Sequence, residues 1–226
     1  MSRKILDQEI QRARDEVLIL GSMVEQTTLR SMEALRDSDP EKSKPILEYD
    51  QRINEKRFDI EGSVIATIAM QQPAAHDLRV LTSILKTSTE LERMGDYAKG
   101  IAVINLRSGG LYVSKMLVDA HYMAGQIVDM LHRALTAFVN EDTILAGKIA
   151  REDILINALY QQIYFEVMDY VVEDPTNNIE RANYILWVGH NLERMADRVK
   201  NICEYTIYIK TGEIIEYDAP PGANRR

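Results

Sequence analysis

The sequence predicts an all-α protein made of two tandem three-helix bundles that are related by an internal repeat. Helix-breaking prolines are few, with six in 226 residues, and they fall between segments of helix-forming composition. No run of two-residue apolar alternation is flanked by hairpin turn residues, so strand signals are absent. The chain also resembles itself at a spacing of about 102 residues, which indicates a duplicated architecture.

The capping residues predict where the helices begin and end. Asp39-Pro40 and Asp174-Pro175 each place an N-cap residue before a proline, whose missing N–H costs nothing in the first turn. Asn140 can cap another helix, and Gly109-Gly110 and Gly212 can end helices. The six predicted helices span residues 3–37, 41–71, 74–107, 112–139, 141–173 and 176–211.

Two motifs occur once in each half of the chain. Leu91-Glu92-Arg93-Met94-Gly95-Asp96 recurs as Leu192-Glu193-Arg194-Met195-Ala196-Asp197, and Asp50-x-x-Ile53-Asn54 recurs as Asp153-x-x-Ile156-Asn157. Short connections between helices make their neighbours antiparallel, which is typical of helical bundles. The two bundles can pack side by side or end to end. The expected repeats span residues 1–109 and 110–213, followed by a flexible tail over 214–226.

Composition excludes several classes of protein. A net charge of −8 opposes binding to nucleic acid, whose phosphates attract basic proteins. The single cysteine, Cys203, cannot form an internal disulfide, so the cytoplasm is the expected location, and we expect its thiol to be a small buried apolar group. No apolar run approaches the roughly 20 residues of a membrane span, so we expect no membrane insertion. The single tryptophan, Trp187, is expected in the core.

Paired carboxylates are the strongest chemical signal in the sequence. Glu92 with Asp96, and Glu193 with Asp197, lie four residues apart on a helix and therefore share a face. Each glutamate also continues a heptad track of apolar residues, which predicts that it points into its bundle. The small residues Gly95 and Ala196 leave room beside them. A carboxylate in such a place is costly unless it is paired or binds a metal.

Antiparallel geometry places further polar residues at the level of these pairs. Counting from Pro73, Asn54 and Glu92 both lie 19 residues away, and Asp50 and Asp96 both lie 23 residues away. Equal counts give equal heights, about 28 and 34 Å from the turn at 1.5 Å per residue. The second half repeats the match about Pro175, with Asn157, Glu193, Asp153 and Asp197. The first helix of each bundle could add Glu25 or, in the second, Asp129 with His132.

The carboxylates need a counter-charge, which a metal ion or the neighbouring arginines could supply. Arg93 and Arg194 follow the glutamates by one residue and so point about 100° away around the helix. This angle favours a metal site over a structural salt-bridge network. Oxygen ligands suit hard ions such as Mg²⁺, Mn²⁺, Ca²⁺ or ferric iron, and carboxylates four residues apart can bridge several ions.

The order and spacing of these motifs resemble the PhoU family of phosphate-signalling regulators, over roughly residues 5–212. The likeness rests on Gly21-x-x-Val24-Glu25, Asp50-x-x-Ile53-Asn54, Gln72-Pro73-Ala74-Ala75-x-Asp77-Leu78-Arg79 and the paired E-R-M-x-D motifs. The second half departs from the pattern, because Pro175-Thr176-Asn177 replaces the start that carries Asp77 and Arg79.

The resemblance implies a cytoplasmic homodimer with multinuclear clusters of iron or zinc. Carried over by position, the metal ligands would be Glu92, Asp96, Glu193 and Asp197, with Asp50 and Asp153 opposite them, and Asn54, Asn157, Glu25 and Asp129 as further ligands or neighbours. Family members are negative regulators of phosphate uptake and of the phosphate-starvation response. They couple the phosphate ABC transporter, through its ATPase subunit, to a sensor histidine kinase by protein–protein contacts.

Two other functions are consistent with a helical bundle rich in carboxylates. A scaffold or chaperone-like protein would dock partners on its acidic faces without a functional metal. A carboxylate-bridged metalloenzyme needs Glu-x-x-His, and none of the four histidines follows a glutamate by three residues. The sequence also contains no Walker loop, no G-x-S-x-G and no dinucleotide fingerprint, so we expect a protein that is not an enzyme.

Overall fold

The computed structural model describes residues 3–110 and 115–215 and contains no strand within them. The predicted start of the fourth helix at residue 112, and residues 216–226 of the predicted tail, lie outside the described residues. All six predicted helices are present. The elements are α1 (Arg3–Arg36), the 3₁₀ turn η1 (Pro40–Ser43), α2 (Lys44–Gln71), α3 (Ala75–Ser108), α4 (Lys115–Asn140), α5 (Thr143–Glu173) and α6 (Pro175–Thr211).

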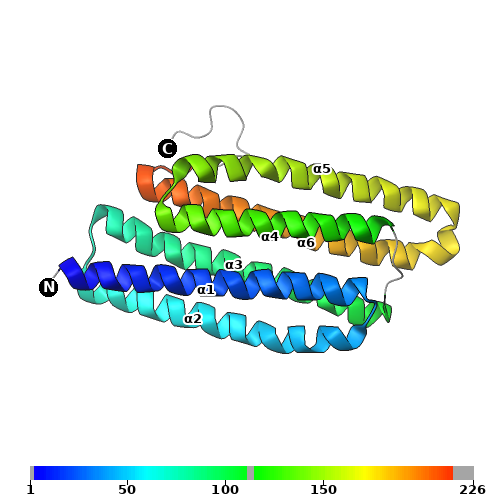
Figure 1. Cartoon of the computed structure of the whole chain (residues 1–226), viewed down its shortest axis with the longest axis horizontal. Helices are drawn as coiled ribbons and strands as arrows, with labels where there is room; N and C mark the ends of the chain where they lie inside the picture. Colours follow the sequence, from blue (N-terminus) through cyan, green and yellow to red (C-terminus); the bar gives the residue numbers. More distant parts are fainter. Residues whose placement is uncertain (1–2, 111–114, 216–226) are drawn as a thin grey trace.

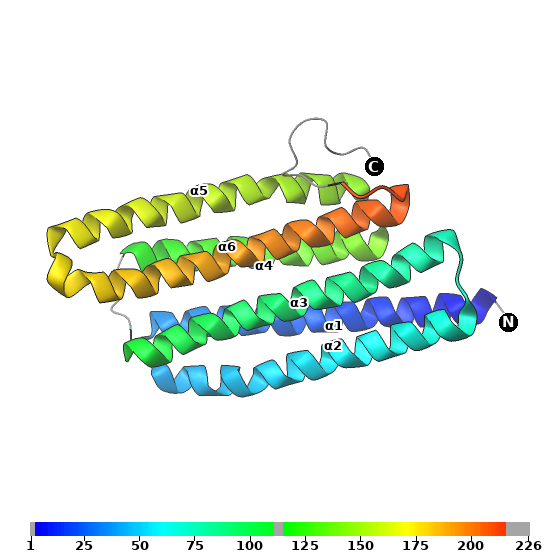
Figure 2. The ribbon, with the colours of Figure 1, turned by 180° about the vertical axis from the view of Figure 1, so that it is seen from behind.

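The two three-helix bundles lie side by side (Figure 1). Helices α1 and α3 of the first bundle face α4 and α6 of the second, while α2 and α5 lie on the outer sides (Figure 2). Buried apolar residues from all six helices form one continuous core, so the repeats share a hydrophobic interior. The structure confirms the predicted all-α repeat and selects side-by-side packing over end-to-end packing.

Capping chemistry explains the helix boundaries and corrects two expectations. Asp39 caps η1 through Glu41 N–H at 3.0 Å, so α2 begins after a 3₁₀ turn and not at residue 41. Asn140 is the last residue of α4 and does not cap α5. Asp142 does so, because its carboxylate accepts hydrogen bonds from two backbone N–H groups. The glycine at 109 adopts a φ of 66° just after α3, as the sequence predicted.

A buried asparagine holds the connection between the first two helices. Asn105 on α3 donates its side-chain amide to the carbonyl oxygens of Ala34 and Asp39 and to the hydroxyl of Ser43, at 3.0 to 3.1 Å. A buried backbone carbonyl without a donor is costly, so these bonds stabilise the irregular η1 segment. The sequence pattern did not indicate this role.

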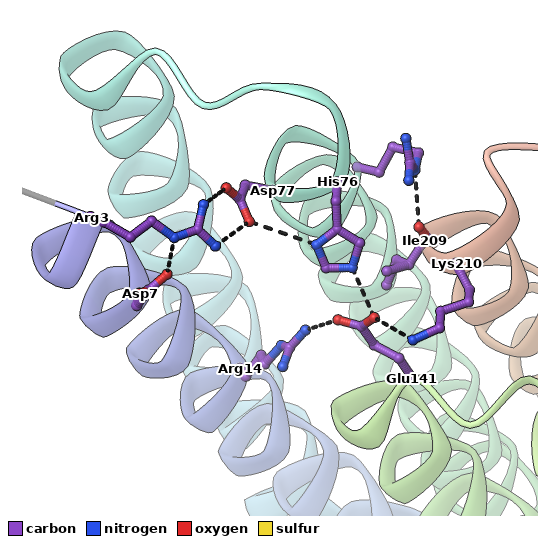
Figure 3. Close-up of polar contacts among 9 residues, drawn as sticks. Arg3, Asp7, Arg14, His76, Asp77, Glu141, Ile209 and Lys210 are labelled. Carbon is purple, nitrogen blue, oxygen red and sulfur yellow. Dashed lines mark hydrogen bonds and ion pairs between the residues drawn. The ribbon is translucent and has the colours of Figure 1, made fainter.

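The two bundles are clamped together at one end of the molecule by the carboxylate of Glu141 (Figure 3). Glu141 lies between α4 and α5 with a φ of 53°, a left-handed conformation that is uncommon for a residue with a side chain. Its carboxylate accepts hydrogen bonds from Arg14 of α1 at 2.5 Å and pairs with His76 of α3 at 2.8 Å. Lys210 of α6 lies 4.0 Å away. The carboxylate of Glu141 therefore connects the α4–α5 loop to α1, α3 and α6.

The start of α3 contributes two more ties at this end. Asp77 accepts a hydrogen bond from Arg3 of α1 at 2.5 Å, and Arg79 donates to the backbone carbonyl of Ile209 on α6 at 2.9 Å. Asp77 and Arg79 therefore hold neighbouring helices. In the second repeat, Asp174 occupies the corresponding helix start and caps α6. Among the described residues, the contacts of Asp77 and Arg79 have no counterpart at this second helix start, as the different sequence there indicated.

Replacement of Glu141 by Gln tests the clamp through its pH dependence. Burial raises the pKa of Glu141, but hydrogen bonds from His76 and Arg14 outweigh that effect, and the pKa lies below its ordinary value. A carboxyl whose pKa is lowered by folding stabilises the fold above its unfolded pKa, and this stability is lost as the pH falls through the folded pKa. We expect Glu141→Gln to cost about 1–3 kcal/mol at neutral pH.

Urea unfolding of both proteins over a pH series measures this difference. The stability gap should close between roughly pH 5 and pH 3, because protonation removes the charge that the variant already lacks. If the difference in unfolding free energy between the two proteins stays constant over that pH interval, the Glu141 carboxylate does not stabilise the contact between the bundles.

Candidate functional site

The first carboxylate cluster lies between α2 and α3. Asp50 projects from α2 and is 5% exposed, while Glu92 is half-buried and Asp96 is exposed on α3. The ammonium nitrogen of Lys99 lies 2.6 Å from a carboxylate oxygen of Asp50. This ion pair joins Asp50 to the turn of α3 that also carries Asp96, so the antiparallel level expected from the sequence is confirmed.

The second cluster lies between α5 and α6 and has the same composition. Asp153 on α5 is 4% exposed, and Glu193 and Asp197 on α6 are half-buried. The ammonium nitrogen of Lys200 lies 3.4 Å from Asp153 Oδ2 and 3.7 Å from Asp197 Oδ1. Asn157 donates its side-chain amide to the same Asp153 oxygen at 3.1 Å. Asp153, Asn157 and Asp197 therefore meet as predicted, through a lysine that was not predicted, while Glu193 pairs with His190 on its own helix at 3.7 Å.

The ionised form of the glutamates is disfavoured in both clusters. The pKa of Glu92 is raised by burial and then by the neighbouring Asp96, and the pKa of Asp96 is raised by burial and by Asp50. In the second cluster the pKa of Glu193 is raised by burial and by Asp197. Burial and nearby like charges both disfavour the ionised form. A further cation beside these carboxylates would therefore stabilise their ionised form.

The glutamates lie less deep than the heptad tracks predicted. The tracks begin at Leu78 and Ile179, and both residues are exposed, because the tracks run along the edge of the helix interface. Glu92 and Glu193 are accordingly half-buried at the rim of each groove. The expectation that they point into the bundle interior was wrong.

The room expected beside Glu92 at Gly95 is also filled. A Cβ atom placed on Gly95 would lie 3.1 Å from the Cδ1 atom of Ile53, so the glycine allows α2 to approach α3 closely. Ala196, its counterpart in the second repeat, is fully buried. These small residues serve helix packing.

The other predicted residues lie at different contacts. Asn54 is half-buried on α2, one turn after Asp50. Glu25 of α1 faces His132 of α4 at 3.4 Å, which places it between the bundles. Asp129 is mostly exposed and pairs with Arg133 on its own helix at 2.7 Å. The structure therefore gives Glu25 and Asp129 partners outside the two clusters.

Sequence reasoning missed Lys99 and Lys200, which follow Asp96 and Asp197 by three residues. The signal was present, because both halves continue the repeated motif as E-R-M-x-D-x-x-K. Residues three apart share a helix face, so the lysine returns to the side that carries the aspartate. The arginine that follows each glutamate takes a lesser part: Arg194 contacts Asp197 at the exposed rim, at 3.1 Å.

Two further expectations concerned single residues on α6. Cys203 is fully buried, as predicted, and burial raises the pKa of its thiol to about 12, so the thiol is unreactive at neutral pH. Trp187 was expected in the core, but its side chain lies on the surface and the residue is 58% exposed. Trp187 directly precedes Val188, which is fully buried, so its side chain points about 100° away from that buried residue around the helix.

The donor chemistry of both clusters fits a hard or borderline cation. Carboxylate oxygens are present in both, and burial together with a neighbouring carboxylate raises the pKa values of Glu92 and Glu193. Within residues 3–110 and 115–215, however, no three acidic, histidine or cysteine side chains form a group arranged to hold a metal ion. The cationic groups near these carboxylates are those of Lys99, Arg57 and Arg93 in the first cluster and of Lys200 and Arg194 in the second. A metal would use the same carboxylates after the lysine withdrew.

The fold and the two clusters define a duplicated all-α protein in which each repeat joins its second and third helices through carboxylates. The family model described as the PhoU domain matches residues 17–104 and 121–206, one match in each repeat. The chain belongs to the PhoU family.

Similarity to individual relatives extends over nearly the whole chain. A phosphate-specific transport system accessory protein PhoU homolog from Clostridium acetobutylicum is 33% identical over 217 residues, covering 96% of this chain and 99% of that protein. The PhoU protein of Escherichia coli is 33% identical over 205 residues, covering 91% and 85%. The crystal structure of the phosphate transport system regulatory protein PhoU from Streptococcus pneumoniae superposes with a TM-score of 0.87 at 30% identity, covering 93% and 99%.

Replacement of Lys99 by Met tests whether this lysine competes with a metal ion. The buried Asp50 carboxylate would lose its counter-charge, so we expect the metal-free variant to lose about 1–3 kcal/mol of stability. Added Zn²⁺ or Mn²⁺ should then raise the melting temperature of Lys99→Met more than that of the wild type. The exposed lysine variant Lys148→Met is the control, and equal metal responses in all three proteins would refute the competition.

The double variant Glu92→Gln with Asp96→Asn tests the ligands themselves. Purified protein should carry about one metal cluster fewer, as measured by inductively coupled plasma mass spectrometry, with unchanged helicity. Without metal, the variant should be as stable as the wild type or slightly more stable, because removing a like-charge pair gains about 0.2–0.5 kcal/mol. Glu193→Gln with Asp197→Asn is the matched variant in the other repeat. An unchanged metal content in both variants would refute the assignment.

Proposed function

We propose that this protein is a negative regulator of phosphate uptake and of the phosphate-starvation response. It would act by protein–protein contacts that couple the phosphate ABC transporter, through its ATPase subunit, to a sensor histidine kinase. The observation that carries this proposal is membership of the PhoU family in both repeats. Relatives that match over most of their length are named as accessory proteins of the phosphate-specific transport system, which supports a regulatory and not a catalytic role.

We further propose that the two clusters bind iron or zinc. Glu92, Asp96 and Asp50 would hold the metal in the first repeat, and the second repeat would use Glu193, Asp197 and Asp153. The bound metal would supply the positive charge that each cluster lacks. Because the ligands come from two helices, metal binding would tie α2 to α3 and α5 to α6, and binding energy available only to the folded arrangement adds to stability. Partners would then contact a more rigid surface.

A cytoplasmic homodimer is the proposed working form. None of the described helices combines the length and apolar character needed to cross a bilayer. Helix α5 exposes several large apolar side chains on the outer side of the second bundle, and such surfaces commonly contact other proteins. These residues are Ile154, Leu155, Phe165 and Val172.

A second candidate is a helical scaffold that works without metal. The specific observation in its favour is that Lys99 and Lys200 already pair with the buried aspartates. A scaffold of this kind would bind its partners through the same faces, whether or not a metal was present.

Binding before and after chelation separates the two candidates. The purified protein is titrated with the transporter ATPase subunit and, separately, with the cytoplasmic region of the sensor kinase, each with and without prior EDTA treatment. A metal-dependent regulator should lose at least tenfold in affinity after chelation and recover it when Fe²⁺ or Zn²⁺ is added back. Equal binding after chelation would favour the scaffold, and absence of binding to both partners would contradict the proposed function.

A further inference from the structure

The internal repeat allows one end of the α3–α6 contact to be compared with the other. Helices α3 and α6 lie side by side and run in opposite directions (Figure 2). A residue on α3 corresponds to one 101 residues later on α6, as Glu92 does to Glu193. Lys86 therefore corresponds to Trp187, and Arg107 corresponds to Tyr208. At each end of the contact a cation on α3 therefore lies across from an aromatic residue on α6: Lys86 with Tyr208 at one end, and Arg107 with Trp187 at the other.

At one end of the contact, the cation of α3 lies against aromatic rings of α6. The ammonium group of Lys86 lies 5.1 and 5.9 Å from the ring centres of Tyr205 and Tyr208. Beside it, Glu90 of α3 pairs with Arg198 of α6 at 3.2 Å and accepts a hydrogen bond from the Tyr205 hydroxyl at 3.0 Å. The cation–π contacts and the ion pair close this end.

At the other end the corresponding side chains stand apart. Trp187 is 58% exposed, and its indole N–H donates to Asn183 on its own helix at 3.1 Å, so its ring faces are free to contact another molecule. Arg107 is exposed and makes no hydrogen bond or ion pair with any described residue. Between them lies a groove of about 320 Å³, lined also by Asp96, Lys99, Gly100, Val103, Ile104 and Asn191.

The floor of this groove is apolar and its helices lie close together. A Cβ atom on Gly100 would lie 3.0 Å from the Asn191 side-chain oxygen, so the glycine permits the close approach of α3 and α6. Ile104 is almost fully buried and Val103 is half-buried beneath the groove. An aliphatic side chain placed here would contact Trp187, Val103 and Ile104 together.

We propose that this groove docks a segment of a partner protein that carries an aliphatic side chain next to a carboxylate. The aliphatic group would lie against the indole of Trp187, and the carboxylate would pair with the guanidinium of Arg107. Charge complementarity supports an acidic segment, because the charged residues that line the groove are two cations, Lys99 and Arg107, and one carboxylate, Asp96, and Arg107 has no carboxylate partner within the described chain. Exposed tryptophan and arginine are also the residues most enriched among those that dominate binding energy. The inference rests on the proposed function for the identity of the partner.

The experiment uses the fact that Trp187 is the only tryptophan. Full-length protein labelled with 5-fluorotryptophan gives one ¹⁹F resonance, which is followed during titration with the unlabelled ATPase subunit and with the unlabelled kinase region. We expect the resonance to shift on binding to one of them. Arg107→Glu and Trp187→Ala should each weaken that complex at least tenfold, while Arg107→Lys and Trp187→Phe should weaken it less than the corresponding severe changes.

Arg151→Glu, an exposed arginine on α5, is the matched control and should bind as the wild type does. A complex that forms with an unchanged resonance and unchanged affinity in Arg107→Glu would overturn the docking site and leave the proposed function standing. A shift produced by inorganic phosphate alone, or by raising the protein concentration alone, would also overturn it, because the occupant would be an anion or a second copy. Absence of binding to both partners would overturn the proposed function and this inference together.

Discussion

A buried aspartate on the second helix of each repeat is the constraint from which the candidate site follows. Asp50 and Asp153 are almost inaccessible to solvent, and an ionised carboxylate in such a place requires a counter-charge. The neighbouring third helix supplies that charge through Lys99 or Lys200. The same helix also brings further carboxylates to the groove, and burial together with these like charges raises the pKa values of Glu92 and Glu193. In the proposed metal-bound form, the ion would stabilise these carboxylates and replace the lysine.

Duplication produces two similar grooves, but the ends of the molecule are used differently. The end that carries Glu141 is closed by ion pairs and hydrogen bonds among α1, α3, α6 and the α4–α5 loop. Toward the opposite end, the groove between Trp187 and Arg107 remains open and adjoins Asp96 and Lys99 of the first cluster. The proposed docking groove therefore lies next to the first carboxylate cluster. If both proposals hold, a partner in the groove would contact Asp96 and Lys99 of that cluster directly.

The helices, the repeat and the level of the carboxylates were predictable from the sequence because prolines, caps and antiparallel turns are local signals. The depth of Glu92 could not be predicted, because a heptad track does not distinguish the centre of a helix interface from its edge. The exposure of Trp187 could not be predicted either. The lysines follow the aspartates by three residues in both repeats, so the spacing contained their signal, whereas the arginines adjacent to the glutamates point about 100° away around the helix. Glu141 could not be placed because its partner Arg14 lies 127 residues away in sequence.

The most direct test of the central claim is anomalous X-ray diffraction from crystals of the metal-loaded protein, with data collected at the absorption edge of iron or zinc. The account predicts anomalous density at both clusters, between Asp50 and the Glu92–Asp96 pair and between Asp153 and the Glu193–Asp197 pair, with Lys99 and Lys200 displaced from the aspartates. Crystals from metal-rich solution that show no such density, with both lysine–aspartate ion pairs retained, would contradict it.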